Sequence, residues 1–290
     1  MSEVAITTRS RGVARLARKN PLLAWGALVA AALIVVALAA PLIAPHPQDA
    51  GSTMHPAATL QSPSRAHPFG TDMYGRDELS RVVYGARVSL SVAGLVLIIA
   101  VAIGVPLGIA AGYFGGVVDN IIMRVTDVFL AFPALLLSLA LVSVLGPSVR
   151  NAVLAISVTW WPWYTRLARG QAASVRGRQF IESCRALGVP RFRMLWRHVL
   201  PNSVTPLIVQ VSLDAGGVIL TAAALSFLGL GAQDPTPEWG LMVSQGQDFF
   251  TTQWWLVTFP GIAILITAMA FNLMGDGLRE VLDPKRVLTR

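Results

Sequence analysis

The chain has few charged residues and one cysteine, and each scarcity excludes a class of protein. Charged residues make up 13% of its 290 residues, whereas soluble proteins average about 25%. A water-soluble surface could hardly be built from so few charges, so the composition indicates an integral membrane protein. The single cysteine, Cys184, excludes a disulfide within the chain and any metal site built from several cysteines.

Lysine is also nearly absent, and the positions of the basic residues show whether the chain could hydrolyse ATP or bind nucleic acid. A phosphate-binding P-loop needs Gly-Lys-Ser or Gly-Lys-Thr, but Lys19 follows Arg18 and Lys285 follows Pro284. The chain is therefore not an ATPase of that type. Its net charge of +8 comes from arginines that lie between long apolar runs. This pattern is typical of membrane loops and argues against a nucleic-acid-binding domain.

Long apolar segments are what the chain has in abundance. Six of them lie near the length of about 20 residues that a membrane helix needs, at 22–43, 88–113, 125–145, 153–167, 206–230 and 255–274. The runs are continuous, which favours helices over a β-barrel. The first run exceeds a signal-peptide core of roughly 7–15 residues, so we expect it to remain uncleaved. The sequence predicts an all-α bundle of six transmembrane helices.

Basic residues are concentrated in three regions that six spans place on one side. They are the N-terminal tail, the loop between the fourth and fifth spans, and the C-terminal tail. Because basic loops face the cytoplasm, we expect both termini there. The loop between spans five and six is acidic, which fits the opposite side. The predicted divisions are a tail 1–20, a first helix 21–44, an outer loop 45–87, a core domain 88–278 and a tail 279–290.

One carboxylate, that of Asp214, lies deep within a predicted span. It could support ion-coupled transport by the chain acting alone. It could also pair with a polar group on a neighbouring helix or line a water-filled path. An intramembrane enzyme would need paired catalytic groups, and no Ser/Lys, Asp/Asp or His-Glu-x-x-His arrangement is evident. In the outer loop, His46, His55 and His67 match no regular metal motif, so no metal site is predicted.

Residues 180–202 form a loop that is basic and interrupted. Gly188 suits the end of one helix and Pro190 the first turn of another, which predicts two short helices. In the second, an apolar face is predicted from the spacing of Phe192, Leu195, Trp196 and Val199. Much of its remaining surface consists of Arg191, Arg193, Arg197 and His198. Such a helix could lie on the bilayer surface or insert into the groove of a partner.

This loop resembles the EAA loop of ABC importer permeases, here at residues 168–203. The matching residues are Glu182, Gly188 and the Arg-His-Val-Leu-Pro-Asn ending at 197–202, while Ser183 and Cys184 stand where the family usually has alanines. In that family the loop forms a short coupling helix that docks into a cleft on a separate ATPase. The resemblance implies a coupling set that comprises Glu182, Gly188, Pro190, Arg191, Phe192, Arg193, Leu195, Trp196, Arg197 and His198. Within it, Phe192, Leu195 and Trp196 are expected as anchors, and Glu182, which lies among arginines, is expected to brace the loop through ion pairs.

Further stretches at 67–90, 225–231, 235–240 and 271–278 are similar to the C-type subunits of dipeptide and oligopeptide permeases. The resemblance implies a chain of the bacterial inner membrane, surrounded by lipid and paired with a homologous B-type permease. Two ATPase domains would bind ATP and magnesium, and an extracytoplasmic substrate-binding protein would deliver the substrate. The chain itself would be no enzyme and would hold no cofactor. Dipeptide, oligopeptide, glutathione and nickel permeases share the pattern, so the substrate stays open.

Overall fold

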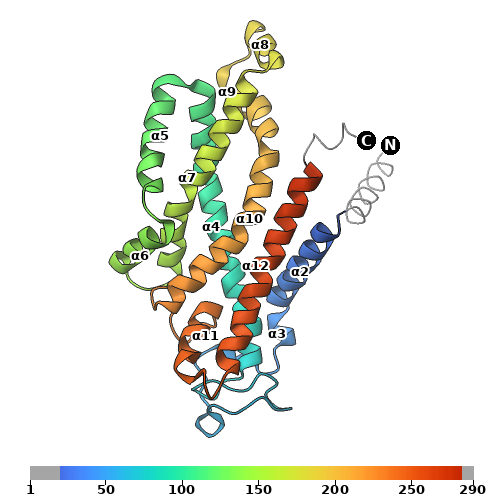
Figure 1. Ribbon diagram of the computed structural model, residues 1–290, viewed down its shortest axis with the longest axis vertical. Helices are drawn as coiled ribbons and strands as arrows, with labels where there is room; N and C mark the ends of the chain where they lie inside the picture. The colour runs from blue at the N-terminus through green and yellow to red at the C-terminus, as the bar shows by residue number, and fades with distance from the viewer. Residues whose placement is uncertain (1–19, 283–290) are drawn as a thin grey trace.

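The computed structural model describes residues 20–282, which form an elongated bundle of α-helices (Figure 1). These residues contain no β-strand, and only an isolated bridge joins Thr71 and Asp77. The predicted all-α class is therefore confirmed. Most of the two predicted tails lies outside the described residues, and so do all of their basic residues except Arg279.

Within the described range 20–282, seven longer helices build the bundle, and short elements connect them. The longer helices are α2 (Pro21–Leu38), α4 (Glu78–Phe114), α5 (Gly116–Leu130), α6 (Ala134–Leu145), α7 (Val149–Arg176), α10 (Leu200–Phe227) and α12 (Trp255–Leu282). The short helices are α3 (Ala40–Ile43), α8 (Gln179–Ala186), α9 (Arg191–Met194) and α11 (Trp239–Gly246). A π-helical turn, η3 (Leu195–Val199), joins α9 to α10, and 3-10 turns occur at η1 (Pro47–Ala50), η2 (Pro56–Ala58) and η4 (Gln247–Phe249).

Four stretches of described helix are long and apolar enough to cross a membrane. They are α2, α4, the joined run 191–227 and α12; α5 and α6 make a fifth only when counted as one span bent by 84°. The predicted third span is thus divided around Pro133, which lacks an N–H and disfavours helical backbone in the residue before it. The predicted fourth span lies within the 28-residue α7. The count of six remains a prediction.

Three glycines on α4 allow it to pack very closely against α7. Gly104, Gly108 and Gly112 recur every four residues and share one face of the helix. A Cβ added to any of them would lie 2.3 or 2.4 Å from a backbone carbonyl oxygen of α7, that of Thr165 in the case of Gly108. Small residues at such positions let membrane helices approach. The contact fixes α7, which leads directly into α8.

The two ends of the bundle are built differently. One end carries α8 and α9, and the start of α2 and the end of α12 point in the same direction (Figure 1). The opposite end is formed by residues 44–77 and 228–254, including α11, which we call the cap. Helix α4 begins at Glu78, and the Asp77 carboxylate caps it by accepting from the Ser80 N–H at 2.8 Å. The loop that the sequence places at 45–87 therefore ends at Asp77.

Candidate functional site

Helix α8 ends at Gly188 in a glycine-dependent cap. Gly188 has a φ of +72°, and its N–H donates to the Arg185 carbonyl at 3.0 Å, while the Val189 N–H donates to the Cys184 carbonyl at 3.1 Å. These two hydrogen bonds define a Schellman motif, in which glycine avoids the strain that a side chain would cause. Pro190 then occupies the N-cap position of α9. The prediction of two short helices on either side of Gly188 is confirmed.

Helix α9 continues through η3 into α10 as one uninterrupted run from 191 to 227. Two inward side chains, Met194 and Val199, are fully buried and hold this run against the core. The prediction that Val199 shares an apolar face with Phe192 and Trp196 is wrong, because Val199 is 0% exposed and the two aromatic residues are 72% and 54% exposed. The π-helical turn has i→i+5 bonding, which changes the angular spacing of side chains from that of an α-helix.

The outward face of the run from 191 to 199 carries two aromatic rings and three guanidinium groups. The rings of Phe192 and Trp196 lie with their centroids 6.1 Å apart. The exposed arginines around them are Arg191, Arg193 and Arg197, and His198 is half-buried. We call Phe192, Trp196 and these arginines the docking patch. Large exposed apolar side chains rimmed by charges are typical of interaction surfaces.

Leu195, the third predicted anchor, is placed differently from the two aromatic residues. It is partly buried and packs against the core. Together with Trp196 and Leu200 it lines an apolar groove of about 320 Å³, whose other wall is α4 from Val101 to Ala110. Leu195 therefore supports the docking patch from beneath rather than forming its surface.

A basic pocket of about 390 Å³ adjoins the docking patch. Arg176, Arg185 and Arg191 line it together with Tyr113, Phe114 and Val189. The guanidinium of Arg185 lies over the Tyr113 ring, 5.5 Å from its centroid. None of the lining residues is acidic, so the pocket fits acidic side chains of a partner better than those of this chain.

Glu182 does not brace the α8–α9 segment as the sequence predicts. Its side chain is exposed, and it forms no ion pair within residues 20–282. The neighbouring arginines extend into the solvent and the basic pocket instead. The Glu182 carboxylate is therefore accessible to a partner.

Asp214 lies on α10, within the run of helix that is apolar enough to span a membrane. It is half-buried, and its Oδ1 accepts a hydrogen bond from Gln210 Nε2 at 2.9 Å, one helical turn away. It forms no ion pair within the described part of the chain. Gln210 lies on the same helix, but Asp214 also interacts with the Tyr164 side chain of α7, in agreement with the expectation of a polar partner on a neighbouring helix.

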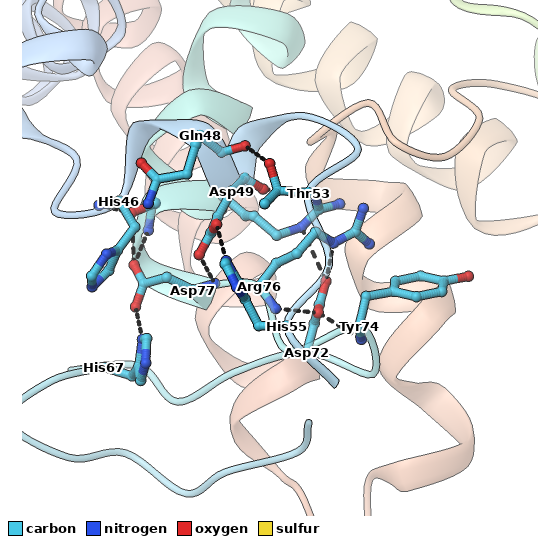
Figure 2. Close-up of polar contacts among 12 residues, drawn as sticks. His46, Gln48, Asp49, Thr53, His55, His67, Asp72, Tyr74, Arg76 and Asp77 are labelled. Carbon is cyan, nitrogen blue, oxygen red and sulfur yellow. Dashed lines mark hydrogen bonds and ion pairs between the residues drawn. The ribbon is translucent and has the colours of Figure 1, made fainter. Parts of the chain in front are cut away.

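The cap contains a buried ion-pair network that the sequence does not reveal. Arg76 is 1% exposed, and it donates to Asp72 Oδ2 at 2.6 Å (Figure 2). It also donates to Asp234 Oδ1 at 2.9 Å. The Nε atom of Arg81 also lies 3.5 Å from Asp72 Oδ2. Burial disfavours the charged guanidinium, but the two carboxylates outweigh this effect and raise the pKa of Arg76. The network ties the segment before α4 to the segment before α11, 158 residues later.

A second contact in the cap fixes the start of α11. Glu238 caps this helix by accepting from the Leu241 N–H at 2.9 Å, and Ser89 Oγ of α4 donates to it at 3.3 Å. The next residue, Trp239, is buried and donates from Nε1 to the Val82 carbonyl at 2.9 Å. Burial raises the pKa of Glu238 despite these hydrogen bonds. Both residues belong to the 235–240 stretch that resembles C-type permease subunits, but no contact with α4 was predicted for them from the sequence.

The chain is similar to known transport proteins over most of its length. Residues 104–287 match the family described as binding-protein-dependent transport system inner membrane component, and residues 9–63 match the N-terminal TM domain of oligopeptide transport permease C. A probable D,D-dipeptide transport system permease, DdpC of Escherichia coli, is 47% identical over 267 residues, covering 92% of this chain and 88% of that protein. A dipeptide transport system permease, DppC of Alkalihalophilus pseudofirmus, is 44% identical over 268 residues, covering 92% and 87%. A glutathione transport system permease, GsiD of Pectobacterium atrosepticum, is 42% identical over 253 residues, covering 87% and 83%.

Among solved structures, the fold is similar to that of a chain of the MetNI methionine ABC transporter in an inward-facing conformation. The TM-score is 0.56 at 15% identity, and the match covers 72% of this chain and 97% of that one. At this identity the likeness concerns the fold alone, a helical membrane bundle. The family match covers more than half of the residues, and several relatives exceed 40% identity over most of their length. The chain therefore belongs to the binding-protein-dependent transport system inner membrane components, the multi-pass permease subunits of ABC importers.

Proposed function

We propose that this chain is the C-type permease subunit of an ATP-driven importer of dipeptides or short oligopeptides. The observation that carries the mechanism is the unbroken helix from the docking patch into α10. The peptide substrate is supported by the names of the relatives, since the two at 47% and 44% identity are dipeptide permeases. The translocation path would lie between this chain and a homologous B-type permease.

The docking patch would transmit the work of the ATPases to the membrane helices. Phe192 and Trp196 are the anchors in this proposal, and the arginines around them meet acidic or carbonyl groups of an ATPase subunit. That subunit would bind ATP and magnesium, since this chain has no P-loop of its own. Shifting a two-state path from 1:99 to 99:1 takes about 5.5 kcal/mol of differential binding. Two exposed aromatic side chains that become fully covered on docking, at about 2.5–4 kcal/mol each, can supply that difference.

The docking patch and both termini would face the cytoplasm in this arrangement. The excess of arginine near the α8–α9 segment supports that orientation. The cap would then face outward, where an extracytoplasmic substrate-binding protein would dock. A rigid cap, held by the network around Arg76, suits a surface that must receive a second protein repeatedly.

Uptake by the reconstituted assembly tests the proposal. This chain, its B-type partner and the ATPase subunits would be placed in proteoliposomes, with the binding protein and a labelled dipeptide outside and ATP inside. We expect uptake that requires both ATP and the binding protein. Uptake of glutathione or nickel with no uptake of dipeptides would overturn the peptide assignment while leaving the importer intact.

The glutathione alternative has one supporting observation, the 42% identity to a glutathione permease. A nickel substrate rests only on the shared sequence pattern. Ion-coupled transport through Asp214 is a different class of mechanism, and a proton gradient without ATP discriminates it. If such a gradient drives uptake in the wild type, and Asp214→Asn abolishes that uptake, the ATP-driven mechanism is wrong.

A further inference from the structure

Two histidines and a carboxylate of the cap converge although they lie far apart in the sequence. His46, His67 and Asp77 each offer one potential metal-ligating atom, and these atoms lie within 4.8 Å of one another. His67 Nδ1 is 2.9 Å from Asp77 Oδ1, and the rings of the two histidines have centroids 5.1 Å apart. Figure 2 shows both imidazoles close to the Asp77 carboxylate. The spacing of the histidines does not predict this cluster, because only the folded chain brings Asp77 close to both of them.

The three residues are held in place by the backbone around them. Asp77 is fully buried at the N-cap of α4, where its Oδ2 accepts from both the N–H and the hydroxyl of Ser80. The same Ser80 hydroxyl oxygen accepts from the His46 N–H at 2.9 Å. Ser80 therefore fixes the backbone of one candidate ligand and the carboxylate of another. Asp77 Oδ1 remains directed at His67 and is available to a cation.

The charge balance of the cap also favours a cation at this position. Arg76 of the cap forms ion pairs with Asp72 and Asp234, and Arg81 of α4 forms one with Asp72. Within residues 20–282, the buried carboxylates of Asp49 and Asp77 form ion pairs only with imidazoles, His55 and His67 respectively. A divalent ion on Asp77 would place a full positive charge beside a buried carboxylate that no arginine or lysine contacts within the described residues.

We propose that His46, His67 and Asp77 form a binding site for a transition-metal ion, with Zn²⁺ as the best fit. Two imidazole nitrogens and one carboxylate oxygen are ligands that Zn²⁺ prefers, with a fourth position left for water. Tetrahedral ligands about 2.0–2.1 Å from zinc lie about 3.3 Å from one another. The His67–Asp77 pair is close to that separation, so assembly of the site mainly requires the half-exposed His46 ring to rotate inward. His55 is no part of it, because its Nε2 contacts Asp49 at 3.0 Å.

The site would cross-link three segments of the cap, which hydrogen bonds such as that from the Asp77 N–H to Asp49 Oδ2 already connect. His46 follows α3, His67 lies in the loop before the Thr71 bridge, and Asp77 starts α4. A bound ion would clamp the loop onto the helix. It would stabilise the surface that lies at the end of the bundle opposite the docking patch.

Zinc titration of the purified full-length chain, carrying no histidine tag, tests the proposal. We expect isothermal titration to give saturable binding of one Zn²⁺ per chain, reversed by EDTA and accompanied by a higher melting temperature. His46→Ala and His67→Gln should each weaken binding at least tenfold. His67→Gln keeps an N–H that can donate to Asp77, so it tests ligation with little loss of structure. The matched controls are His55→Gln in the same cap and His198→Gln at the opposite end, and both should bind as the wild type does.

Three outcomes would overturn the site: no saturable binding by the folded wild type, binding within threefold of wild type in both ligand variants, or an equal loss in a control. If a ligand variant elutes as an aggregate, the absorption spectrum of Co²⁺ bound to the wild type decides. An intense visible spectrum of tetrahedral cobalt with nitrogen ligands supports the site, and the weak spectrum of hydrated cobalt overturns it.

Discussion

Truncation of the two docking aromatics should separate the permease from its ATPase. Phenylalanine and tryptophan side chains cover roughly 150–250 Å² when fully buried. Given exposures of 72% and 54%, complete docking would cover roughly 100–150 Å² of each ring. At about 25 cal/mol per Å², this corresponds to about 2.5–4 kcal/mol per side chain. Taking the lower value, each alanine substitution should weaken ATPase binding about sixty-fold, and the double variant by less than the product, because neighbouring anchors are not additive.

Biolayer interferometry measures this loss directly when the permease is held in lipid nanodiscs and the ATPase subunits are added in solution. Phe250→Ala combined with Trp254→Ala is the matched control, since it removes two exposed aromatic side chains from the cap. That control should leave ATPase affinity unchanged. A loss smaller than threefold in Phe192→Ala/Trp196→Ala, with the protein still folded, would refute the assignment of the docking patch. An equal loss in the cap control would show that the measurement reports general damage.

Two further predictions concern stability. Gly108→Ala should destabilise the chain by about 1–3 kcal/mol, because the added methyl group meets the Thr165 carbonyl oxygen. Gly94 has open space around it, so Gly94→Ala should be neutral or slightly stabilising. Similar melting temperatures for the two variants would contradict this expectation. Burial raises the pKa of Glu238 in the folded state, so the folded chain holds a proton there more readily than the unfolded chain does. The resulting contribution to the free energy of unfolding is present below the unfolded pKa of about 4.3 and is lost as pH rises above it. Glu238→Gln should flatten that part of the melting-temperature profile, and a steeper decline with pH in the variant would show that the sign is wrong.

Local features of the fold could be predicted because they depend on residues close in the sequence. The apolar runs that became α2, α4, α10 and α12 are long and continuous, and a Gly188 end followed by a proline restart is a short-range signal. The break between α5 and α6 was harder to foresee. Pro106 and Pro162 lie inside continuous helices, whereas Pro133 separates two, and the sequence around each proline does not distinguish these outcomes.

The candidate site could be predicted only in part, and the reason is distance along the chain. Phe192, Leu195 and Trp196 were expected as docking anchors; the two aromatic side chains are exposed and Leu195 is partly buried, and docking itself stays a prediction. Val199 was misplaced because a π-helical turn cannot be recognised from apolar spacing. The pairing of Arg76 with Asp234 and the meeting of His46 with Asp77 require contacts between separate segments, which no local pattern encodes.

The unbroken run of 37 residues from 191 to 227 has a mechanical consequence. At 1.5 Å per residue it is roughly 55 Å long, so a tilt of about 5° at the docking patch displaces its far end by about 5 Å over that length. The far end is tied to the cap, where Ser244 Oγ donates to the Phe227 carbonyl at 2.8 Å. If an ATPase binds the docking patch as proposed, the run would act as a lever, and a small rotation imposed at that end would become a displacement of α11 at the other end.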